Sequence, residues 1–290
     1  MGRIFLFLVC LLNTTNLCGQ QSCTHELGYH LLGKVKSIRT TCFRASDKNG
    51  VLVKENTKAY TDDISFFDKD GKHLRMLVFN TKGNVETEHE YHYSNGKLSS
   101  NKKLDPNGIV VETIHYVYGE NGDLLQLDSE RNGMRSIWIE YQYDEDGNYY
   151  EFHFESEQDT LFIFKNIVDK NKNIVNRYQY IPVANPESSY FPEKLGNDRL
   201  YKLTNSEYDK NGHCILTETY WGDGSLFGKT YQHYDGQGNA TVSYTVSDNS
   251  KPSTVEFDYI NFDSFGNWVK ANYQTVFGDY IYERRIEYYD

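Results

Sequence analysis

A six-residue segment recurs along this chain and constrains its fold more than any other feature. The segment reads YDEDGN at Tyr143–Asn148, and related copies read FDKDGK at 67–72, YDKNGH at 208–213, YDGQGN at 234–239 and FDSFGN at 262–267. The residues at the glycine position of the repeat are Gly71, Gly96, Gly122, Gly147, Lys172, Gly212, Gly238 and Gly266. Most steps between them are 25 or 26 residues. A fixed period of this length is typical of repeat architectures.

The spacing Asp-x-x-Gly predicts a turn at each copy. The first-position Asp can accept a hydrogen bond from the backbone two residues on, and the glycine can adopt positive φ without a Cβ clash. Such turns close antiparallel hairpins and place a bulge at the glycine. We therefore interpret the following residues as structural turn residues: Asp68, Gly71, Asp144, Gly147, Asp209, Gly212, Asp235, Gly238, Asp263 and Gly266.

A second, looser series of turns lies halfway between these copies, for example at Gly83, Gly108, Gly133 and Gly224. The stretches between turns are rich in Tyr, Phe, Ile, Val and Thr, which favour strands. The fold class predicted is therefore all-β, a long antiparallel up-and-down meander of hairpin repeats that forms one coiled or rolled sheet. A sheet of roughly fifteen strands cannot stay flat, because each strand twists relative to the last. The sequence leaves open whether the sheet closes on itself.

The first nineteen residues, Met1–Gly19, have the three parts of a secretory signal peptide: Arg3, an apolar run at 4–12 and a polar stretch at 13–16. With cleavage after Gly19, we expect an exported, soluble chain. It would be located in the periplasm, at the outer-membrane surface or outside the cell. A lipid anchor at Cys18 or Cys23 is the alternative that we do not favour.

The rest of the chain divides into a leader and one domain. We predict an N-terminal leader at 20–33 and a single β-repeat domain at 34–290, interrupted by a loop inserted at Pro182–Asp198, which holds three of the five prolines. No later stretch is apolar enough to span a membrane as a helix.

The charge balance excludes some partners. The chain has 30 basic and 41 acidic residues, a net charge of −11, which argues against nucleic-acid binding and against attachment to anionic lipid. Beyond the predicted signal peptide the cysteines are Cys23, Cys42 and Cys214. Cys23 and Cys42 are candidates for a disulfide, which would leave Cys214 as a lone thiol; the sequence does not decide whether they pair.

No motif indicates a cofactor, a metal or a catalytic site, and we expect none of the three. The calcium-loop reading of YDEDGN fails because Gln142 and His153 stand where an EF-hand needs acids. The nine histidines have no ligand spacing, and the acids are spread along the strands, as at Glu86, Glu88 and Glu90. A hydrolase with two facing carboxylates stays as the weakest alternative.

The repeat resembles the YD repeats of the rearrangement-hotspot (Rhs) family. The resemblance rests on Tyr-Asp-x-x-Gly-Asn and covers roughly 34–290, and FDSFGNWVKANY followed by ERRIEYYD is similar to the end of exported proteins of Bacteroidetes type. The stretch YSNGKLSS at 93–100 is also similar to the membrane-occupation type of repeat. The resemblance implies an antiparallel sheet wound into a shell or spiral. It transfers no catalytic residue, and the toxin-enclosing role of large Rhs proteins is not carried over to so short a chain.

The aromatic content of the chain suggests binding. The chain has 25 Tyr, 16 Phe and 3 Trp, and aromatic side chains supply contact area at binding surfaces. Trp138, Trp221 and Trp268 are the candidate binding residues, and the alternative is that their rings cap the sheet core. We therefore expect a non-catalytic scaffold that binds an envelope or extracellular protein. The second hypothesis is a glycan-binding module that uses exposed aromatic rings.

Overall fold

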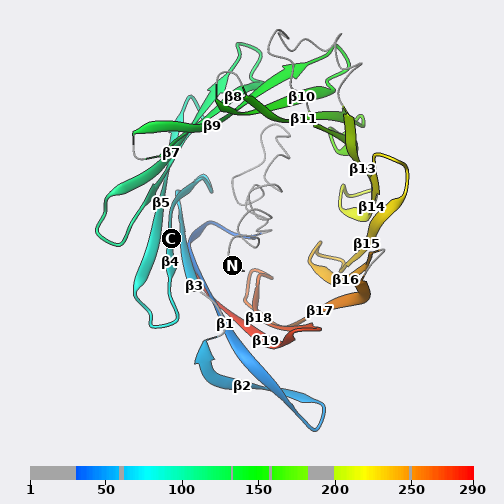
Figure 1. The fold of residues 1–290 in the computed structure, drawn as a ribbon. Helices are drawn as coiled ribbons and strands as arrows, with labels where there is room; N and C mark the ends of the chain where they lie inside the picture. Colours follow the sequence, from blue (N-terminus) through cyan, green and yellow to red (C-terminus); the bar gives the residue numbers. More distant parts are fainter. Residues whose placement is uncertain (1–30, 59–61, 132, 157–158, 182–198, 248–249) are drawn as a thin grey trace. The chain divides into compact units, whose positions relative to one another are not determined.

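A computed structural model of the chain describes residues 31–58, 62–131, 133–156, 159–181, 199–247 and 250–290 (Figure 1). The predicted signal peptide, most of the predicted leader, the two candidate lipidation cysteines and the predicted inserted loop at 182–198 lie outside these residues. The described part of the chain divides into two compact units. Unit 1 comprises residues up to Glu90 together with Asp258–Tyr273 and Gly278–Asp290, and unit 2 comprises Tyr91–Phe257 and Gln274–Phe277.

The all-β prediction is confirmed, since the described residues form strands joined by turns. Unit 1 contains β1 (Val35–Lys48), β2 (Val51–Lys58), β3 (Asp62–Phe67), β4 (His73–Phe79), most of β5 (Val85–Ser94), the end of β17 (Ser250–Phe262), most of β18 (Trp268–Thr275) and β19 (Gly278–Tyr288). No helix long and apolar enough to cross a membrane occurs in the described part of the chain.

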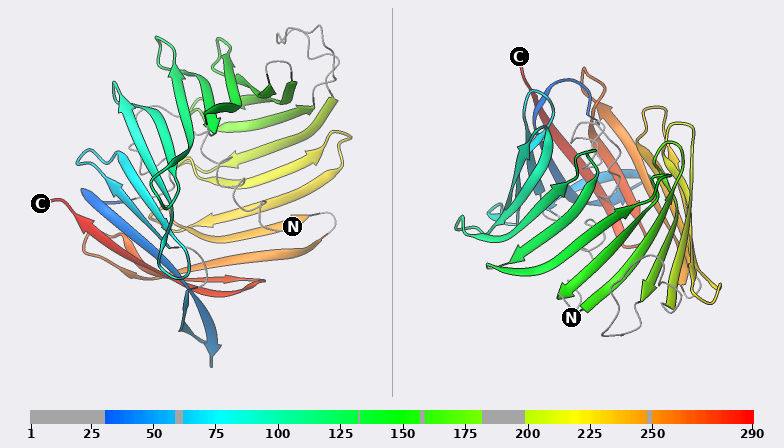
Figure 2. Two further views of the ribbon diagram at one scale, coloured as in Figure 1. Left: turned by 60° about the vertical axis from the view of Figure 1, so that its left-hand side comes forward. Right: turned by 90° about the horizontal axis from the view of Figure 1, so that it is seen from above.

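Unit 2 is a run of antiparallel strands that pair in sequence order (Figure 2). Its strands are β6 (Lys97–Leu104), β7 (Val110–Tyr118), β8 (Leu124–Arg131), β9 (Met134–Tyr143), β10 (Tyr149–Ser156), β11 (Asp159–Val168), β12 (Ile174–Ile181), β13 (Arg199–Tyr208), β14 (Cys214–Trp221), β15 (Leu226–Tyr234), β16 (Ala240–Ser247) and most of β17. The register shifts beside the turn in most of these hairpins, for example at Glu207/Tyr208 between β13 and β14. Glycine-containing hairpin turns produce such bulges.

The prediction of a meander that forms one coiled or rolled sheet is wrong, because the strands pair in a closed order. In unit 1, β1 pairs with β3 on one side and with β19 on the other, and Ile38 lies opposite both Ser65 and Ile286. Among the described strands the antiparallel pairing is therefore closed, because β1 joins the first strands of the order to β19, and β2 forms a hairpin with β1. An unpaired edge strand exposes a row of backbone donors and acceptors, and closure removes it.

The closing strands of unit 1 also form its core. Val35, Ile38 and Phe67 are buried together, and the partly buried Leu31, Ile286 and Tyr288 pack against them. Asn267 fastens the chain beside this core, because its amide donates to Leu32 O (2.8 Å) and its Oδ1 accepts from Leu32 N (2.7 Å). The segment that leads into β1 is thus held by a side chain to the turn between β17 and β18.

Candidate functional site

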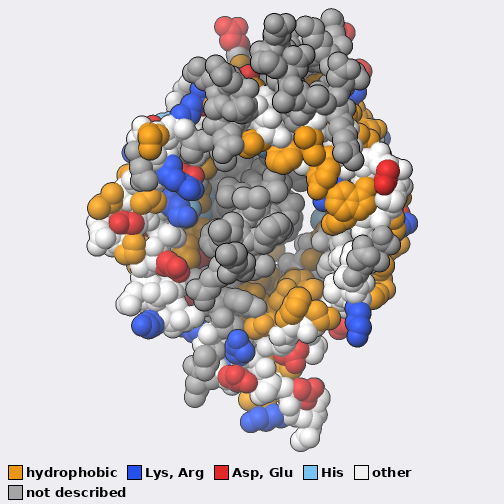
Figure 3. Space-filling view, in the orientation of Figure 1, with side chains coloured by type: hydrophobic (Ala, Val, Ile, Leu, Met, Phe, Trp, Pro, Cys, Tyr) orange, Lys and Arg blue, Asp and Glu red, His pale blue; other side chains and the backbone are white. Residues whose placement is uncertain are grey.

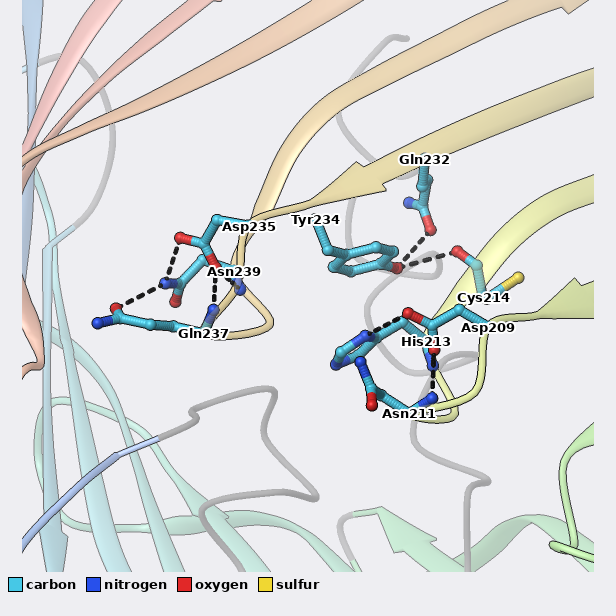
Figure 4. A network of polar contacts seen from close by, with 9 residues as sticks. All are labelled: Asp209, Asn211, His213, Cys214, Gln232, Tyr234, Asp235, Gln237 and Asn239. Carbon is cyan, nitrogen blue, oxygen red and sulfur yellow. Dashed lines mark hydrogen bonds and ion pairs between the residues drawn. The ribbon is translucent and has the colours of Figure 1, made fainter.

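The repeated turns have one hydrogen-bond pattern. In the turn between β13 and β14, Asp209 Oδ1 accepts from the backbone N–H of Asn211 (2.8 Å) and of His213 (2.9 Å) (Figure 4). Gly212 N donates to Asp209 O at 3.1 Å, and Gly212 has φ +84°. The predicted turn residues at 68/71, 144/147, 235/238 and 263/266 make the same contacts. One oxygen of each Asp carboxylate is thus engaged by two backbone donors of its own turn.

These hydrogen bonds lower the pKa of several turn carboxylates. The backbone N–H of His213 is the main cause at Asp209, and the side chain of Asn148 is the main cause at Asp144. The pKa of Asp105 is lowered in the same way by the backbone N–H of Ile109. Because the ionised form accepts these bonds better, each carboxylate stabilises its turn while it stays charged. No group of three or more His, Cys, Asp or Glu side chains is arranged for a metal within the described residues.

The tyrosine of the repeat joins neighbouring turns. Tyr234 Oη donates to Cys214 O at 3.0 Å (Figure 4), and Cys214 lies two residues after the glycine of the preceding turn. The same contact joins Tyr143 to Leu124 and Tyr208 to Ile174, each at 3.0 Å. His213 stacks on the ring of Tyr234 with centroids 4.6 Å apart, and its Nε2 would lie 2.8 Å from a Cβ placed on Gly238. In the Tyr-Asp-x-x-Gly pattern, the tyrosine therefore contacts the neighbouring repeat, while the Asp and Gly form the turn itself.

The three candidate tryptophans are packed rather than freely exposed. Trp138 is buried, stacks on Phe154 (4.9 Å between centroids) and lies against the guanidinium of Arg135. Trp268 is half-buried beneath the guanidinium of Arg284, at 3.4 Å from the ring centroid. These two rings therefore leave little surface for a ligand, which the predicted binding role requires. The third, Trp221, lies in a different environment.

Trp221 ends β14 and is half-buried among other rings. It meets Phe227 edge-on at 4.8 Å and Tyr201 at 5.5 Å between centroids. The ammonium of Lys202 lies 4.7 Å from its ring centroid. The structure therefore gathers one of the predicted binding residues into a cluster with a cation that the sequence analysis did not single out.

Unit 2 also contains a buried polar cluster around Glu151, on neighbouring strands β10, β11 and β12. Glu151 accepts hydrogen bonds from Asn166 Nδ2 (2.9 Å) and from Arg177 Nη2 (3.0 Å), and His153 Nε2 lies at 3.0 Å. Burial would raise the pKa of Glu151, but the partners His153 and Arg177 hold it below its usual value. The cluster contains one carboxylate, so it is not the facing pair of acids that a glycosidase needs. The contacts of Glu151 thus join side chains of three neighbouring strands.

Solvent-exposed tyrosines lie on strands β15 and β16. Tyr231 and Tyr244 are directly opposite each other in the ladder, with ring centroids 6.3 Å apart, and are 38% and 36% exposed. In Figure 3 hydrophobic side chains gather along the right-hand margin, where Figure 1 places β13–β16. The sequence analysis did not select this pair. Phe227, Lys229, Tyr231 and His233 alternate along β15 and so share one face of the sheet, which is a signal that could have indicated an aromatic surface there.

The cysteines show no bridge within the described residues. Cys42 is a buried free thiol whose pKa is raised by burial, and Cys214 is a half-buried free thiol. The predicted partner of Cys42, Cys23, lies outside the described residues, so the disulfide stays a prediction.

Fold and turns together define an all-β repeat protein whose antiparallel strands pair in a closed order. No protein-family model matches the chain, and no curated protein matches it. The chain is similar to the crystal structure of TcdB2-TccC3-TEV, with 10% identity and a TM-score of 0.32 over 82% of this chain. It spans 15% of the length of that protein.

The chain is also similar to two porin-like proteins. One is from Bacteroides uniformis ATCC 8492, with 11% identity and a TM-score of 0.33, covering 89% of this chain and 98% of that one. The other is from Bacteroides vulgatus ATCC 8482, with 11% identity and a TM-score of 0.28, covering 88% and 98%. At such TM-scores no statement about family or function rests on these likenesses, and the YD-repeat resemblance stays a prediction.

Proposed function

We propose that this chain is an exported protein of the cell envelope that acts as a non-catalytic scaffold for binding another protein. The observation that carries the proposal is the exposed pair Tyr231 and Tyr244 on the paired strands β15 and β16. Tyrosine is favoured at protein interfaces because its large, rigid ring adds contact area at low entropy cost. The signal-peptide pattern and the acidic composition support export of a soluble chain.

Polar groups on the neighbouring strand give this surface the mixed character of an interface. Glu218 on β14 lies opposite Lys229 on β15 and forms an ion pair with it, and Tyr220 Oη donates to Glu218 at 2.9 Å. Leu216 lies opposite Tyr231 in the same ladder. An aromatic centre with charged and hydroxyl groups at its margin matches the usual anatomy of a protein interface.

Co-purification from native cells tests this proposal. The chain is tagged at its C-terminus, cross-linked and analysed by mass spectrometry for a stoichiometric envelope protein. The double substitution Tyr231→Ala/Tyr244→Ala should remove that partner, whereas Phe277→Ala, which alters a side chain that is 88% exposed, should retain it. A protein that purifies alone, or a partner that remains with the double variant, would overturn the proposal.

A glycan-binding module is the second candidate function, and the cluster around Trp221 favours it. Two aromatic rings at a large mutual angle, Trp221 and Phe227 at 86°, offer apolar faces and edges on which the C–H groups of a sugar ring can pack. Phe227 is 38% exposed, so part of this surface is open to solvent.

A further inference from the structure

One lysine in unit 2 is held among three aromatic rings. The ammonium of Lys202 lies 4.1 Å from the ring centroid of Phe227, 4.7 Å from that of Trp221 and 5.4 Å from that of Tyr201. These residues come from strands β13, β14 and β15, which lie side by side in Figures 1 and 2. A cation over aromatic faces is attracted by the negative ring quadrupole, so the rings hold the ammonium in place.

The backbone fixes the geometry of this cluster. Lys202 and Trp221 are directly opposite in the β13–β14 ladder. The next residue, Gly222, donates its N–H to Tyr201 O at 2.9 Å, and a Cβ at this position would lie 1.8 Å from Leu200 O. Only glycine therefore allows the turn after β14 to lie so close to the start of β13, and the cluster is positioned before any ligand arrives.

The charge of Lys202 is not neutralised by a carboxylate within the described residues. Lys229 on the next strand but one forms an ion pair with Glu218, whereas the ammonium of Lys202 contacts aromatic rings among the described side chains. Burial lowers the pKa of Lys202 from its usual value. Partial burial of an ammonium without a countercharge is unfavourable, and a ligand that brings an anion relieves that cost.

We propose that Lys202, Trp221 and Phe227 form a site for an acidic sugar, a uronic-acid unit of a glycan. The sugar carboxylate pairs with the Lys202 ammonium, and the C–H groups of the pyranose ring pack against Trp221 and Phe227. This inference rests on the glycan-binding candidate and is independent of the protein-scaffold proposal.

The ligand chemistry follows from the pairing of a charge with rings. A neutral sugar would stack on the rings but leave the ammonium uncompensated, and a simple anion would leave the rings unused. The net charge of −11 does not oppose this contact strongly, because charges farther away than the Debye length of about 8 Å at physiological salt are screened. The site therefore selects a carboxylate carried on a saturated ring.

Calorimetric titration with matched oligosaccharides tests the inference. The purified protein is titrated with tri-galacturonate, a hyaluronan hexamer and an alginate trimer, and with the fully methyl-esterified form of each, which keeps the rings and removes the charge. We expect binding of at least one acid form, with its ester about tenfold weaker or worse, as expected for the loss of one charge pair. Lys202→Met should weaken binding of the acid form by a similar factor, and Lys202→Arg should retain most of it.

A matched control is available in the same hairpin. Lys210 is exposed in the turn at the opposite end of β13, so Lys210→Met changes the net charge equally and should leave binding unchanged. Equal binding of acid and ester, or binding unaffected by Lys202→Met, would overturn the acidic-sugar inference and leave the glycan-binding candidate standing. Failure of every acid form and every ester to bind would overturn both. The comparison of acid with ester needs no variant, so it holds even if Lys202→Met misfolds.

Discussion

The two ends of strand β14 have opposite characters. At its start, the turn from Asp209 to His213 satisfies its own carboxylate and backbone groups and joins to the next repeat through Tyr234. At its end, the turn after Trp221 lies against β13 through Gly222 and holds an ammonium without a carboxylate partner in the described residues. The first end repeats along the chain and stabilises the sheet. The second keeps the same backbone hydrogen bonds, since Gly224 N donates to Trp221 O, but has Trp221 where the first has Asp209. Binding is to be sought where the side chains differ from the repeat in this way.

Of the substitutions considered for the two ends of β14, a change at Gly222 should destabilise the protein most. Gly222→Ala places a Cβ against Leu200 O, so the turn must move away from β13. We expect the free energy of unfolding, measured by urea denaturation, to fall by about 2–4 kcal/mol. Gly236→Ala is the matched control, because nothing lies within 4 Å of its Cβ position. A loss at Gly222 no larger than at Gly236 would contradict the packing described.

The tyrosine contact between repeats should have a smaller effect. Tyr234→Phe keeps the ring under His213 but removes the hydrogen bond to Cys214 O, so we expect a loss of about 1 kcal/mol in urea denaturation. Tyr231→Phe, which changes an exposed hydroxyl on the same strand, serves as the control and should cost almost nothing. If both variants lose equally, the hydroxyl of Tyr234 does not join the turns.

Acid should destabilise the repeated turn, because protonation of Asp209 weakens its hydrogen bonds to the backbone. The pKa of Asp209 is lower in the folded chain, mainly through the backbone N–H of His213, so its stabilisation is present above the unfolded pKa and is lost as the pH falls through the folded pKa. We expect Tm to decrease as the pH falls below about 4. Asp209→Asn, which keeps an acceptor oxygen but does not titrate, should show a slightly shallower decrease. A decrease identical to that of the wild type would show that this carboxylate does not contribute.

A change at Lys202 should affect stability least, and it distinguishes a packing role of this residue from a binding role. Lys202→Met should change the free energy of unfolding by about 0.5 kcal/mol or less, because the lost attraction to the rings is offset by removal of a partly desolvated charge and methionine packs well against rings. Thermal denaturation measures the change. A loss of several kcal/mol would assign Lys202 to the packing of the sheet rather than to a binding site.

Local chemistry explains what the sequence could predict. The Asp and Gly positions of the turns follow from hydrogen bonds within five residues, and the strands follow from the residues between turns. The pairing of β1 with β19 was missed because it joins residues such as Ser37 and Glu287, which are 250 positions apart. No short pattern reports such a contact.

The candidate site could be predicted only in part. Trp221 was selected for its ring, but Lys202 and Phe227 lie on different strands, and only the ladder register places them beside Trp221. Their separation of 25 residues is close to one repeat, so Lys202 and Phe227 come from strands that lie two apart in the sheet. The sequence also did not predict how exposed the other two tryptophans are. Neighbouring cations and rings cover Trp138 and Trp268, and the residues around them in the sequence do not show this.

The closing ladder has a consequence for how the chain folds. Each hairpin of unit 2 can form as soon as two neighbouring strands meet, whereas β1 and β19 must find each other across a loop that contains nearly all the described residues. Loop closure of this length adds an entropic barrier and raises the contact order, both of which slow folding. The β1–β19 ladder should therefore be the last to form. A circular permutant that joins Asp290 to Leu31 through a short linker and opens at the exposed Gly133 turn would make this ladder an ordinary hairpin, and the slow step would move to the newly opened pair of strands.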